Sequence, residues 1–425
     1  MDCNCSKTNN ENKISEVMLE KTKKHPCYSF DAHKKFARMH LPVAPNCNVS
    51  CNYCNRKFDC VNESRPGVTS EILTPKEAKI KFDKVKEKIG QLSVVGIAGP
   101  GDALENWENT KKSIELIRAE NPNIVFCLST NGLMLPEYAQ EIIELGVTHV
   151  TVTVNCLDSK IGAKIYKYVN YKGKHYDGEL GSKLLIKNQL KGIALLTSQG
   201  NIVKINIVML QGINDDHIPE VVKKMKELGV FITNIMPLIP ARGSVFEKHP
   251  QTNMKDLIKM RKLCELDVQQ MHHCKQCRAD AIGLIGEDRS QEFSKKALEL
   301  EVLPLDDEEK NVKKIKVAVT SKNGRLVDLH YGHAKEFMIY EINGSNSSYI
   351  ETRQVDQYCL GLEECDEEDA RRDAAVDLIA DCDAVLTLRI GHYAEQKLLR
   401  RGIRSVIYWY TIEQGLKLVQ KELIN

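Results

Sequence analysis

The feature that most restricts the fold is an alternation of short apolar segments with longer amphipathic ones, from about residue 37 to 285. Six short segments have the length and composition of β-strands, at 37–44, 92–98, 123–129, 148–154, 201–210 and 231–238. Helical periodicity is found at 75–89, 108–120, 136–145, 183–199, 217–228 and 254–272. Six β-α repeats predict a parallel sheet with right-handed crossovers, partly closed as an incomplete (βα)6 TIM-like barrel.

Beyond this region the sequence predicts a linker and a smaller domain. Residues 287–312 are dense in charged side chains and poor in glycine, which is typical of a linker. Strands are expected at 313–321, 324–330, 335–342, 348–355, 383–390 and 403–409, with helices near 366–380, near 393–401 and at the C-terminus. A chain of 425 residues favours two domains. We expect a disordered tail over 1–24, a first domain over 25–286 and a small α/β domain over 313–425.

The composition excludes several classes of function. Lys plus Arg (60) and Asp plus Glu (58) nearly cancel, so we expect neither nucleic acid nor an anionic membrane surface as a partner. The polar N-terminus lacks the apolar core of a signal peptide, and no uncharged apolar run is long enough to span a bilayer. We therefore expect a cytoplasmic protein. The 15 cysteines of a protein in a reducing compartment indicate metal binding or redox chemistry rather than disulfides.

A cluster of cysteines follows the first predicted strand directly. Cys47, Cys51 and Cys54 have the spacing C-x3-C-x2-C, and Cys60 stands apart. A structural zinc site takes four ligands, so zinc would need Cys60 as the fourth. A [4Fe–4S] cluster held by only three thiolates keeps one iron open for another ligand. The position at a strand end, where βα folds collect their chemistry, favours the cluster.

With the aromatic Tyr53 before Cys54, the motif resembles that of the radical S-adenosylmethionine (SAM) superfamily, C-x3-C-x-Φ-C with Φ aromatic. The resemblance implies a [4Fe–4S] cluster whose open iron chelates the amino and carboxylate groups of SAM, with Tyr53 beside the adenine or the cluster. Asp102 would accept hydrogen bonds from the methionine ammonium, although an ordinary glycine turn also explains its segment. The residues that the resemblance places around SAM are Gly99, Gly101, Asp102, Ser129, Thr130 and Asn206.

The first domain holds more cysteines than SAM binding requires. Cys274 and Cys277 form a C-x2-C pair, a spacing at which two thiolates reach one metal centre. Cys264 lies nearby in the sequence. Free cysteine is also a common small core residue, which leaves the role of Cys264 open and favours simple burial for Cys156.

Five segments, at 25–29, 38–60, 64–68, 96–102 and 271–283, are similar to hallmark segments of the NifB family, the radical SAM maturases of the nitrogenase cofactor. The part from about residue 314 resembles the NifX/NafY-like cofactor-carrier domain, of ribonuclease H-like fold. The resemblance implies that two [4Fe–4S] substrate clusters, K1 and K2, are fused around a SAM-derived carbide into the [8Fe–9S–C] precursor. It implies as partners iron–sulfur cluster donors, a reduced ferredoxin or flavodoxin, and downstream carrier or scaffold proteins.

The same resemblance supplies ligands for the two substrate clusters. For K1 they are Cys27, Cys60 and Cys127, with His40 as a nitrogen ligand and His25 as its competitor. For K2 they are Cys274 and Cys277, with Cys264 left open as a third. A neutral imidazole is exchanged more easily than a thiolate, which suits a cluster that must leave. Glu63 and Arg65 are hypothesised to position or protonate an intermediate.

Two other functions stay open. A radical SAM enzyme with permanent auxiliary clusters, for example one that modifies peptides, would carry the same motif. A non-catalytic carrier of iron–sulfur clusters would explain the second domain but not the aromatic residue of the motif. In that domain His333 and His392 suit transient contact with a metal cluster, and loop residues without a ligand explain them equally well. Cys3 and Cys5 receive no role.

Overall fold

The structure, a computed structural model, describes residues 19–55, 65–241, 243–293, 314–344, 346–356, 368–388, 390, 392–409 and 411–424. The chain divides into two compact units, Met1–Ser290 and Gln291–Asn425, each described below by itself. No described helix is both long and apolar enough to cross a bilayer.

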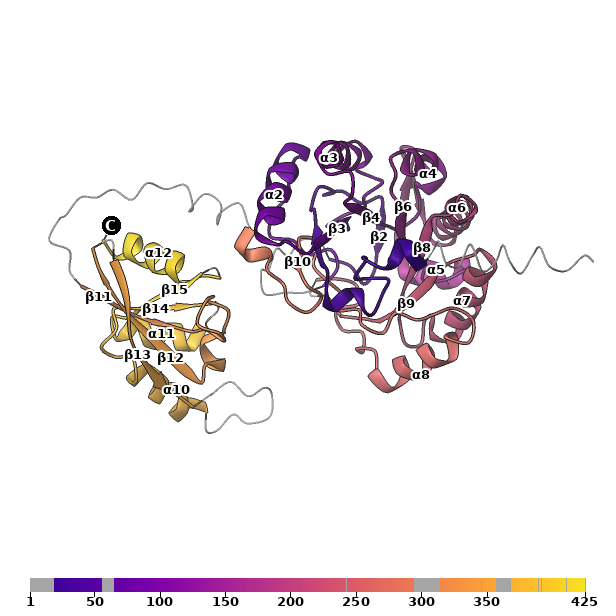
Figure 1. The fold of residues 1–425 in the computed structure, drawn as a ribbon. Helices are drawn as coiled ribbons and strands as arrows, with labels where there is room; N and C mark the ends of the chain where they lie inside the picture. The colour runs from indigo at the N-terminus through magenta and orange to yellow at the C-terminus, as the bar shows by residue number, and fades with distance from the viewer. Residues whose placement is uncertain are drawn as a thin grey trace, which may run out of the picture. The chain divides into compact units, whose positions relative to one another are not determined.

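A seven-stranded sheet forms the first unit, in the order β10-β1-β3-β4-β5-β8-β9. Its parallel strands are β1 (Ala37–His40), β3 (Leu92–Ile97), β4 (Val125–Thr130), β5 (His149–Thr153), β8 (Ile202–Met209) and β9 (Ile232–Pro237). At one edge β10 (Ile282–Gly283) runs antiparallel to β1. All six predicted strands are confirmed, and the sheet is the expected partial barrel (Figure 1).

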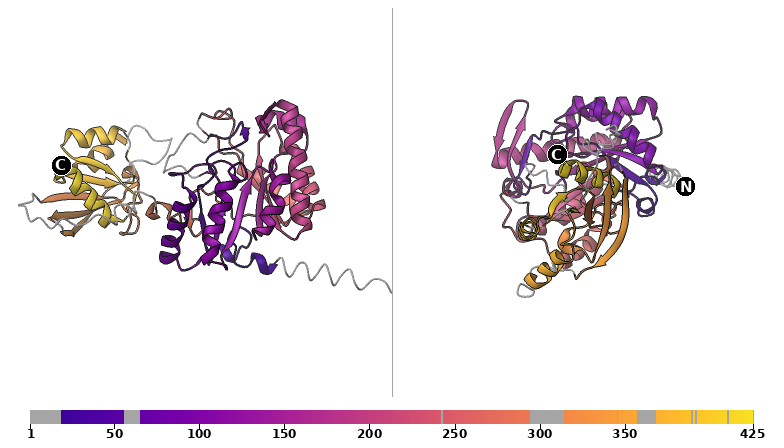
Figure 2. Two further views of the ribbon diagram at one scale, coloured as in Figure 1. Left: turned by 90° about the horizontal axis from the view of Figure 1, so that it is seen from above. Right: turned by 90° about the vertical axis from the view of Figure 1, so that its left-hand side faces the viewer.

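Helices cover the outside of this sheet (Figures 1 and 2). They are α2 (Pro75–Lys88), α3 (Trp107–Glu120), α4 (Leu135–Glu144), α6 (Gly178–Ser198), α7 (Ile218–Glu227) and α8 (Met254–Cys264). The sequence explains the start of α2, where Thr74 and Glu77 form a reciprocal capping box before a proline. The helix predicted over 254–272 is wrong beyond Cys264, because α8 ends there with Glu265 as its C-cap.

Between β5 and α6 lies an excursion that the sequence reading missed. It contains α5 (Ser159–Ile165), β6 (Tyr166–Tyr171) and β7 (Lys174–Asp177). The two strands form a hairpin, and β6 pairs antiparallel with β2 (Val49–Cys51) to give a separate three-stranded sheet. Short 3₁₀ turns lie at η1 (Ala32–Lys34), η2 (Asp215–His217), η3 (Ser290–Phe293) and η4 (Tyr331–His333).

The second unit is a mixed five-stranded sheet in the order β13-β12-β11-β14-β15, as expected for a small α/β domain. Its elements are β11 (Ile315–Val319), β12 (Glu336–Asn343), β13 (Asn346–Gln354), α10 (Glu368–Asp377), β14 (Ala384–Thr387), α11 (His392–Arg400), β15 (Arg404–Ile407) and α12 (Ile412–Ile424). On one face Ala318 and Val385 pack with α10 and α11, and on the other Val317 and Leu386 pack with α12. Alternate strand residues thus serve two cores.

One strand predicted in this unit is wrong. Residues 324–330 form a loop, in which Leu326 makes only an isolated bridge to Thr411. Side chains at the start of the loop take the backbone donors that a strand would need. Ser321 accepts a hydrogen bond from the amide of Gly324, and Asn323 accepts one from the amide of Arg325. Local side-chain acceptors of this kind compete with strand pairing.

Candidate active site

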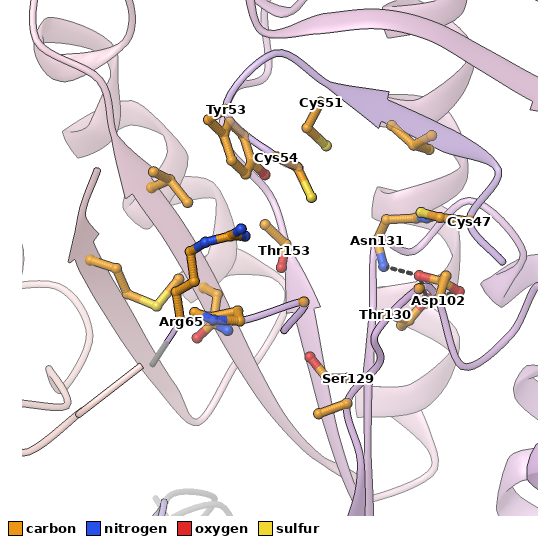
Figure 3. A pocket seen from close by; sticks show the side chains of 18 of the residues that line it. Cys47, Cys51, Tyr53, Cys54, Arg65, Asp102, Ser129, Thr130, Asn131 and Thr153 are labelled. Atoms are coloured by element: carbon orange, nitrogen blue, oxygen red, sulfur yellow. Dashed lines mark hydrogen bonds between the residues drawn. The ribbon is translucent and has the colours of Figure 1, made fainter. Parts of the chain in front are cut away.

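Three cysteines lie on the loop between β1 and α2, and the small second sheet holds that loop. Cys51 ends β2 and pairs with Tyr166 of β6. The amide of Cys54 donates a hydrogen bond to the carbonyl of Cys51 (3.0 Å). Together with Cys47 these residues line one cavity of about 230 Å³ (Figure 3).

The cavity lies where parallel strands end, as the sequence predicted for the site. Predicted residues that line it are Tyr53, Arg65, Gly101, Asp102, Ser129, Thr130 and Asn206. Ser129 and Thr130 come from the end of β4, and Asn206 comes from β8. Gly99 is not among the described lining residues. The side-chain carbonyl of Asn206 accepts a hydrogen bond from Nδ2 of Asn234 on the neighbouring strand (3.0 Å).

Gly101 brings the turn after β3 against the backbone that leads into the cysteine loop. Its amide donates a hydrogen bond to the carbonyl of Ala44 (2.6 Å), and the next amide donates to the carbonyl of Asn46 (2.8 Å). A Cβ atom on Gly101 would lie only 2.0 Å from the carbonyl oxygen of Asn46. The close approach inferred from the sequence is therefore real, and its partner is the chain's own backbone just before Cys47.

Asp102 is a buried carboxylate that several of the chain's own donors already contact. It accepts hydrogen bonds from the hydroxyl of Thr130 (3.0 Å), the amide of Asn131 (2.6 Å) and the amide of Leu104 (2.9 Å). Burial raises the pKa of Asp102, and these hydrogen bonds oppose that rise. A methionine ammonium would have to share the carboxylate with them. The arrangement shows Asp102 tying the turn after β3 to the end of β4.

Tyr53 is held by a residue that the sequence reading missed. Asn155, fully buried just after β5, donates from Nδ2 to the hydroxyls of Tyr53 and Tyr166 (both 3.1 Å) and accepts from the amide of Val208 (2.9 Å). Burial raises the pKa of Tyr53 well above its ordinary value, so the hydroxyl keeps its proton. Asn155 thus fixes the aromatic ring next to the cysteines. A polar residue directly after a predicted strand was the available signal.

Asn131 also escaped the sequence reading, although it directly follows Ser129 and Thr130, which were predicted at the site. Its Nδ2 lies 3.7 Å from the sulfur of Cys47 and donates to Asn48 (2.8 Å). Gln189 of α6 in turn donates to the carbonyl of Asn131 (2.7 Å). A donor aimed at a thiolate stabilises its charge, because hydrogen bonds to ionised acceptors are the stronger ones.

These residues fit a [4Fe–4S] cluster that binds SAM. The loop supplies three thiols, and among the described residues that line the cavity no fourth cysteine or histidine is present. No described group of three or more Cys, His, Asp or Glu is close enough to share a single metal ion. The thiolates of a cubane bind different iron atoms and therefore stand further apart than ligands of one ion. The donor set is that of a cluster with one open iron.

A second group of side chains that can bind metal lies below the SAM cavity, toward the amino ends of the strands. Cys127 precedes Ser129 by two residues on β4 and so faces the same side of the sheet. A Cβ atom built on Gly96 of β3 would lie 3.1 Å from the sulfur of Cys127 and 3.4 Å from Nε2 of His40. Two of the predicted K1 ligands therefore flank one point of the sheet.

Hydrogen bonds distinguish the two histidines that compete as nitrogen ligand. Nδ1 of His40 lies 2.9 Å from the carbonyl of Arg278, so it must donate and Nε2 is left without a proton. Nδ1 of His25 instead accepts from the amide of Cys27 (3.2 Å), so the proton of a neutral His25 sits on Nε2. Burial lowers the pKa of His40 to about 4, which keeps the ring neutral. An Nε2 without a proton, fixed by a hydrogen bond at the other ring nitrogen, is the arrangement that a metal-ligating histidine needs, and His40 has it.

The remaining thiols gather around Cys27. Cys27 and Cys274 both pack against a buried cluster that contains Tyr28 and Met271. Burial raises the pKa of Cys27, and the nearby thiols of Cys277 and Cys274 add to that rise. Burial also raises the pKa of Cys127 to about 12, with Cys27 as the next contribution. Cys127, Cys274 and Cys277 thus each lie within electrostatic reach of Cys27.

Other predicted residues lie apart or outside the described residues. Cys264 is buried at the end of α8 with its sulfur 3.8 Å from that of Met260, so its part in K2 stays a prediction. Cys60 and Glu63 lie outside the described residues, as do Cys3 and Cys5.

Cys156 is buried in the core, as expected, beside the cavity. Arg65 lies buried at the cavity wall, so its predicted place at the site agrees with its position.

In the second unit, the ring of His333 is 4.9 Å from that of His330, a neighbour that the sequence reading did not select. His333 is exposed. His392 begins α11, and its side chain lies outside what the structure describes. Contact of this unit with a cluster stays a prediction.

Comparison with known proteins places the chain in a family. A profile of the radical SAM superfamily matches residues 41–240, and the profile described as "Dinitrogenase iron-molybdenum cofactor" matches residues 313–422. The FeMo cofactor biosynthesis protein NifB of Klebsiella pneumoniae is 43% identical over 417 residues, which cover 93% of this chain and 89% of the relative. The protein of the same description from Azotobacter vinelandii is 38% identical over 99% of this chain and 92% of its own.

The chain belongs to the NifB family. It is therefore a radical SAM enzyme of nitrogenase cofactor biosynthesis, with a [4Fe–4S] cluster and SAM as its cofactors. The fold expected from the sequence, a radical SAM partial barrel followed by a mixed α/β domain, is confirmed. The family match agrees with the cysteine motif and the five sequence segments on which the resemblance rested.

Proposed function

We propose that this member of the NifB family fuses two [4Fe–4S] substrate clusters, K1 and K2, around a carbide derived from SAM, which yields the [8Fe–9S–C] precursor of the nitrogenase cofactor. The observation that supports the proposal is a second set of four thiols in the same unit, drawn from three distant parts of the chain and close enough to influence one another. These are Cys27, Cys127, Cys274 and Cys277. Cleavage of SAM alone has no use for this set.

The cavity residues bind and orient while the cofactors carry the difficult chemistry. Cys47, Cys51 and Cys54 would hold the resident cluster, which when bound and reduced would supply the electron for reductive cleavage of SAM to methionine and a 5′-deoxyadenosyl radical. Asn155 holds Tyr53 beside that loop by a hydrogen bond to its hydroxyl (3.1 Å), which fixes the aromatic ring at the wall of the cavity.

Arg65 and His40 complete the proposal, together with Glu63, which lies outside the described residues. Arg65, buried at the cavity wall, positions or protonates an intermediate together with Glu63. His40 is a neutral, exchangeable ligand of K1, because the carbonyl of Arg278 fixes its tautomer and burial keeps it uncharged. A cluster held partly by imidazole is released more easily than one held by thiolates alone.

Partners follow from the same proposal. Cluster donor proteins supply K1 and K2, a reduced ferredoxin or flavodoxin supplies electrons, and the precursor leaves for a carrier or scaffold protein. The profile match of residues 313–422 supports a role of the second unit in holding the product or docking that carrier.

The test is anaerobic reconstitution of the full chain with iron counting and product analysis. Three variants each remove one set of cysteines by substitution with alanine: Cys47/Cys51/Cys54, Cys27/Cys127, and Cys274/Cys277. The matched control is Cys382→Ala, a buried cysteine in the core of the second unit. Each set should account for about one cluster of iron, and only the first should abolish 5′-deoxyadenosine.

The outcomes separate the alternatives. Extra iron that leaves the protein as a carbide-containing product after SAM turnover supports the proposal. Extra iron that remains bound and unchanged would instead indicate permanent auxiliary clusters, as in a peptide-modifying enzyme. A chain that binds clusters but forms no 5′-deoxyadenosine would be a carrier.

A further inference from the structure

Lys204 is a buried lysine on the cavity side of the barrel. It lies on β8 two residues before Asn206, which lines the SAM cavity, so both side chains face the same side of the sheet. Only 7% of Lys204 is exposed. Its ammonium lies 4.9 Å from the centre of the Tyr28 ring, and the hydroxyl of Tyr28 lies 3.3 Å from that of Thr151 on the adjacent strand.

Within the described residues, no carboxylate and no hydrogen-bond acceptor pairs with the Lys204 ammonium. Among the described residues Lys81 is also a buried lysine, with 3% exposed. Its ammonium, unlike that of Lys204, forms an ion pair with a carboxylate, that of Glu71. Removing an ammonium from water costs several kcal/mol unless an opposite charge compensates it. One ring face compensates part of that cost, since cation–π contacts contribute about 0.5–2 kcal/mol. A bound anion next to the ammonium would offset the rest of the cost of burying its charge.

The groups around Lys204 indicate the chemical class of that anion. The Tyr28 ring that the ammonium contacts packs edge-on against the imidazoles of His25 (4.5 Å between ring centres) and His149 (4.8 Å). Cys27 packs against the buried cluster that contains Tyr28, and Cys127 pairs with His149 across β4 and β5. The cation therefore faces thiols and imidazoles, which are metal ligands rather than partners for a phosphate or a carboxylate. A cluster bound through several thiolates is itself an anion, because the thiolates outweigh the charge of its core.

We propose that Lys204 is the counter-charge of the substrate cluster held by Cys27, Cys127 and His40, stabilising that cluster on the protein and making it easier to reduce. The inference rests on the proposed function, since it needs a cluster at this set. It assigns Lys204 a positioning and electrostatic role without direct ligation. Net charge near a cluster is one of the factors that set its reduction potential.

The test compares Lys204→Met, which keeps the length and loses the charge, with Lys204→Arg, which keeps the charge. Lys187→Met on the exposed face of α6 removes the same charge at the surface and is the matched control. All are made in the full chain whose Cys47, Cys51, Cys54, Cys274 and Cys277 are replaced by alanine, so one cluster is observed. The readouts are iron per chain, a redox titration followed by electron paramagnetic resonance, and thermal unfolding without iron.

We expect Lys204→Met to shift the oxidised-to-reduced ratio of the cluster at least about tenfold toward oxidised, which is about 59 mV for one electron, and to lower iron occupancy. Without iron, the same variant should unfold at a higher temperature than its parent, because an uncompensated buried charge is gone. A purely structural lysine would give the opposite shift in unfolding. Lys204→Arg and Lys187→Met should keep the parent's potential.

Failure of this inference is distinguishable from failure of the proposed function. A parent chain that binds no cluster at the remaining set overturns the proposed function and this inference with it. A parent that binds one, with Lys204→Met unchanged in occupancy and potential, overturns the role of Lys204 alone. Lys204→Gln repeats the comparison if Lys204→Met does not fold, and an unchanged potential there has the same meaning.

Discussion

Replacing Gly101 by alanine should disturb the loop that carries the SAM-cluster cysteines. The new Cβ would lie 2.0 Å from the carbonyl oxygen of Asn46 and 2.9 Å from that of Ala44. Both are backbone atoms, so no side-chain rotation relieves the overlap. The turn after β3 must move away from the segment that ends at Cys47.

The magnitude follows from what that movement breaks. Overpacking of a filled site costs about 1–3 kcal/mol. The hydrogen bonds from the amides of Gly101 and Asp102 to the carbonyls of Ala44 and Asn46 contribute about 0.5–1.5 kcal/mol each. The sum is roughly 2–6 kcal/mol. At about 2 °C per kcal/mol for a large domain, the unfolding temperature of the iron-free chain should fall by at least about 4 °C.

The assay is thermal unfolding followed by circular dichroism, with iron per chain measured after anaerobic reconstitution. Gly90→Ala is the matched control, because nothing lies within 4 Å of a Cβ at Gly90 and its backbone accepts an L-residue. It should leave both quantities unchanged or raise stability slightly. If Gly101→Ala unfolds at the same temperature as Gly90→Ala and binds as much iron, the proposed contact between the turn and the cysteine loop is refuted.

Three further substitutions test the surroundings of the site. Asp102→Asn replaces an acceptor of the Asn131 amide by a group that also donates, and should lower the unfolding free energy by about 2–4 kcal/mol in chemical denaturation; an unchanged midpoint contradicts this. Asn155→Leu removes the donor to Tyr53 and should weaken SAM binding in equilibrium dialysis by about tenfold, or about 1.4 kcal/mol; unaltered binding argues against the role of Asn155. Burial lowers the pKa of His149 from 6.5 to about 3. Between these two pH values His149 is protonated in the unfolded chain and neutral in the folded chain. The free energy of unfolding should therefore fall by up to about 1.4 kcal/mol per pH unit as the pH drops from about 6.5 to about 3. His149→Phe should flatten this slope, and an equal slope in both chains would contradict it.

The six strands of the barrel were predictable because each lies in a short apolar segment between helical periods, so one local pattern decided each element. The hairpin of β6 and β7 was missed because it interrupts that pattern between a strand and a helix. Its signal was present, however. It is the glycine of the Lys172-Gly173 pair. Both residues have positive φ (50° and 73°), as the two central residues of a tight hairpin turn do, and glycine is favoured at such positions. Alternating aromatic residues flank that turn.

The site was less predictable because its parts meet only in three dimensions. Motif spacing placed Cys47, Cys51 and Cys54 on one loop, which needs no tertiary information. Asn155 and Lys204, in contrast, look like ordinary polar residues of strands and strand ends. Their significance depends on burial, and burial of one polar residue is set by packing of elements far apart in the sequence.

The choice between His40 and His25 shows where sequence reasoning stops. Both histidines lie near predicted cysteine ligands, and no spacing rule separates them. The decision depends on which ring nitrogen carries the proton, and that is set by the carbonyl of Arg278 for one ring and the amide of Cys27 for the other. The amide of Cys27 is local to His25, but Arg278 lies 238 residues from His40 in the sequence, so only the folded chain brings the deciding carbonyl to the ring.

Gly96 of β3 lies between two of the predicted K1 ligands, His40 and Cys127. A glycine inside a buried strand weakens the strand, so its presence needs a reason. A Cβ at this position would lie 3.0 Å from the His40 ring and 3.1 Å from the sulfur of Cys127, tighter than ordinary contact. Any larger residue would press these two side chains away from β3. The absence of a side chain at Gly96 lets an imidazole from β1 and a thiol from β4 approach the same point across the strand between them, which is what a shared cluster requires.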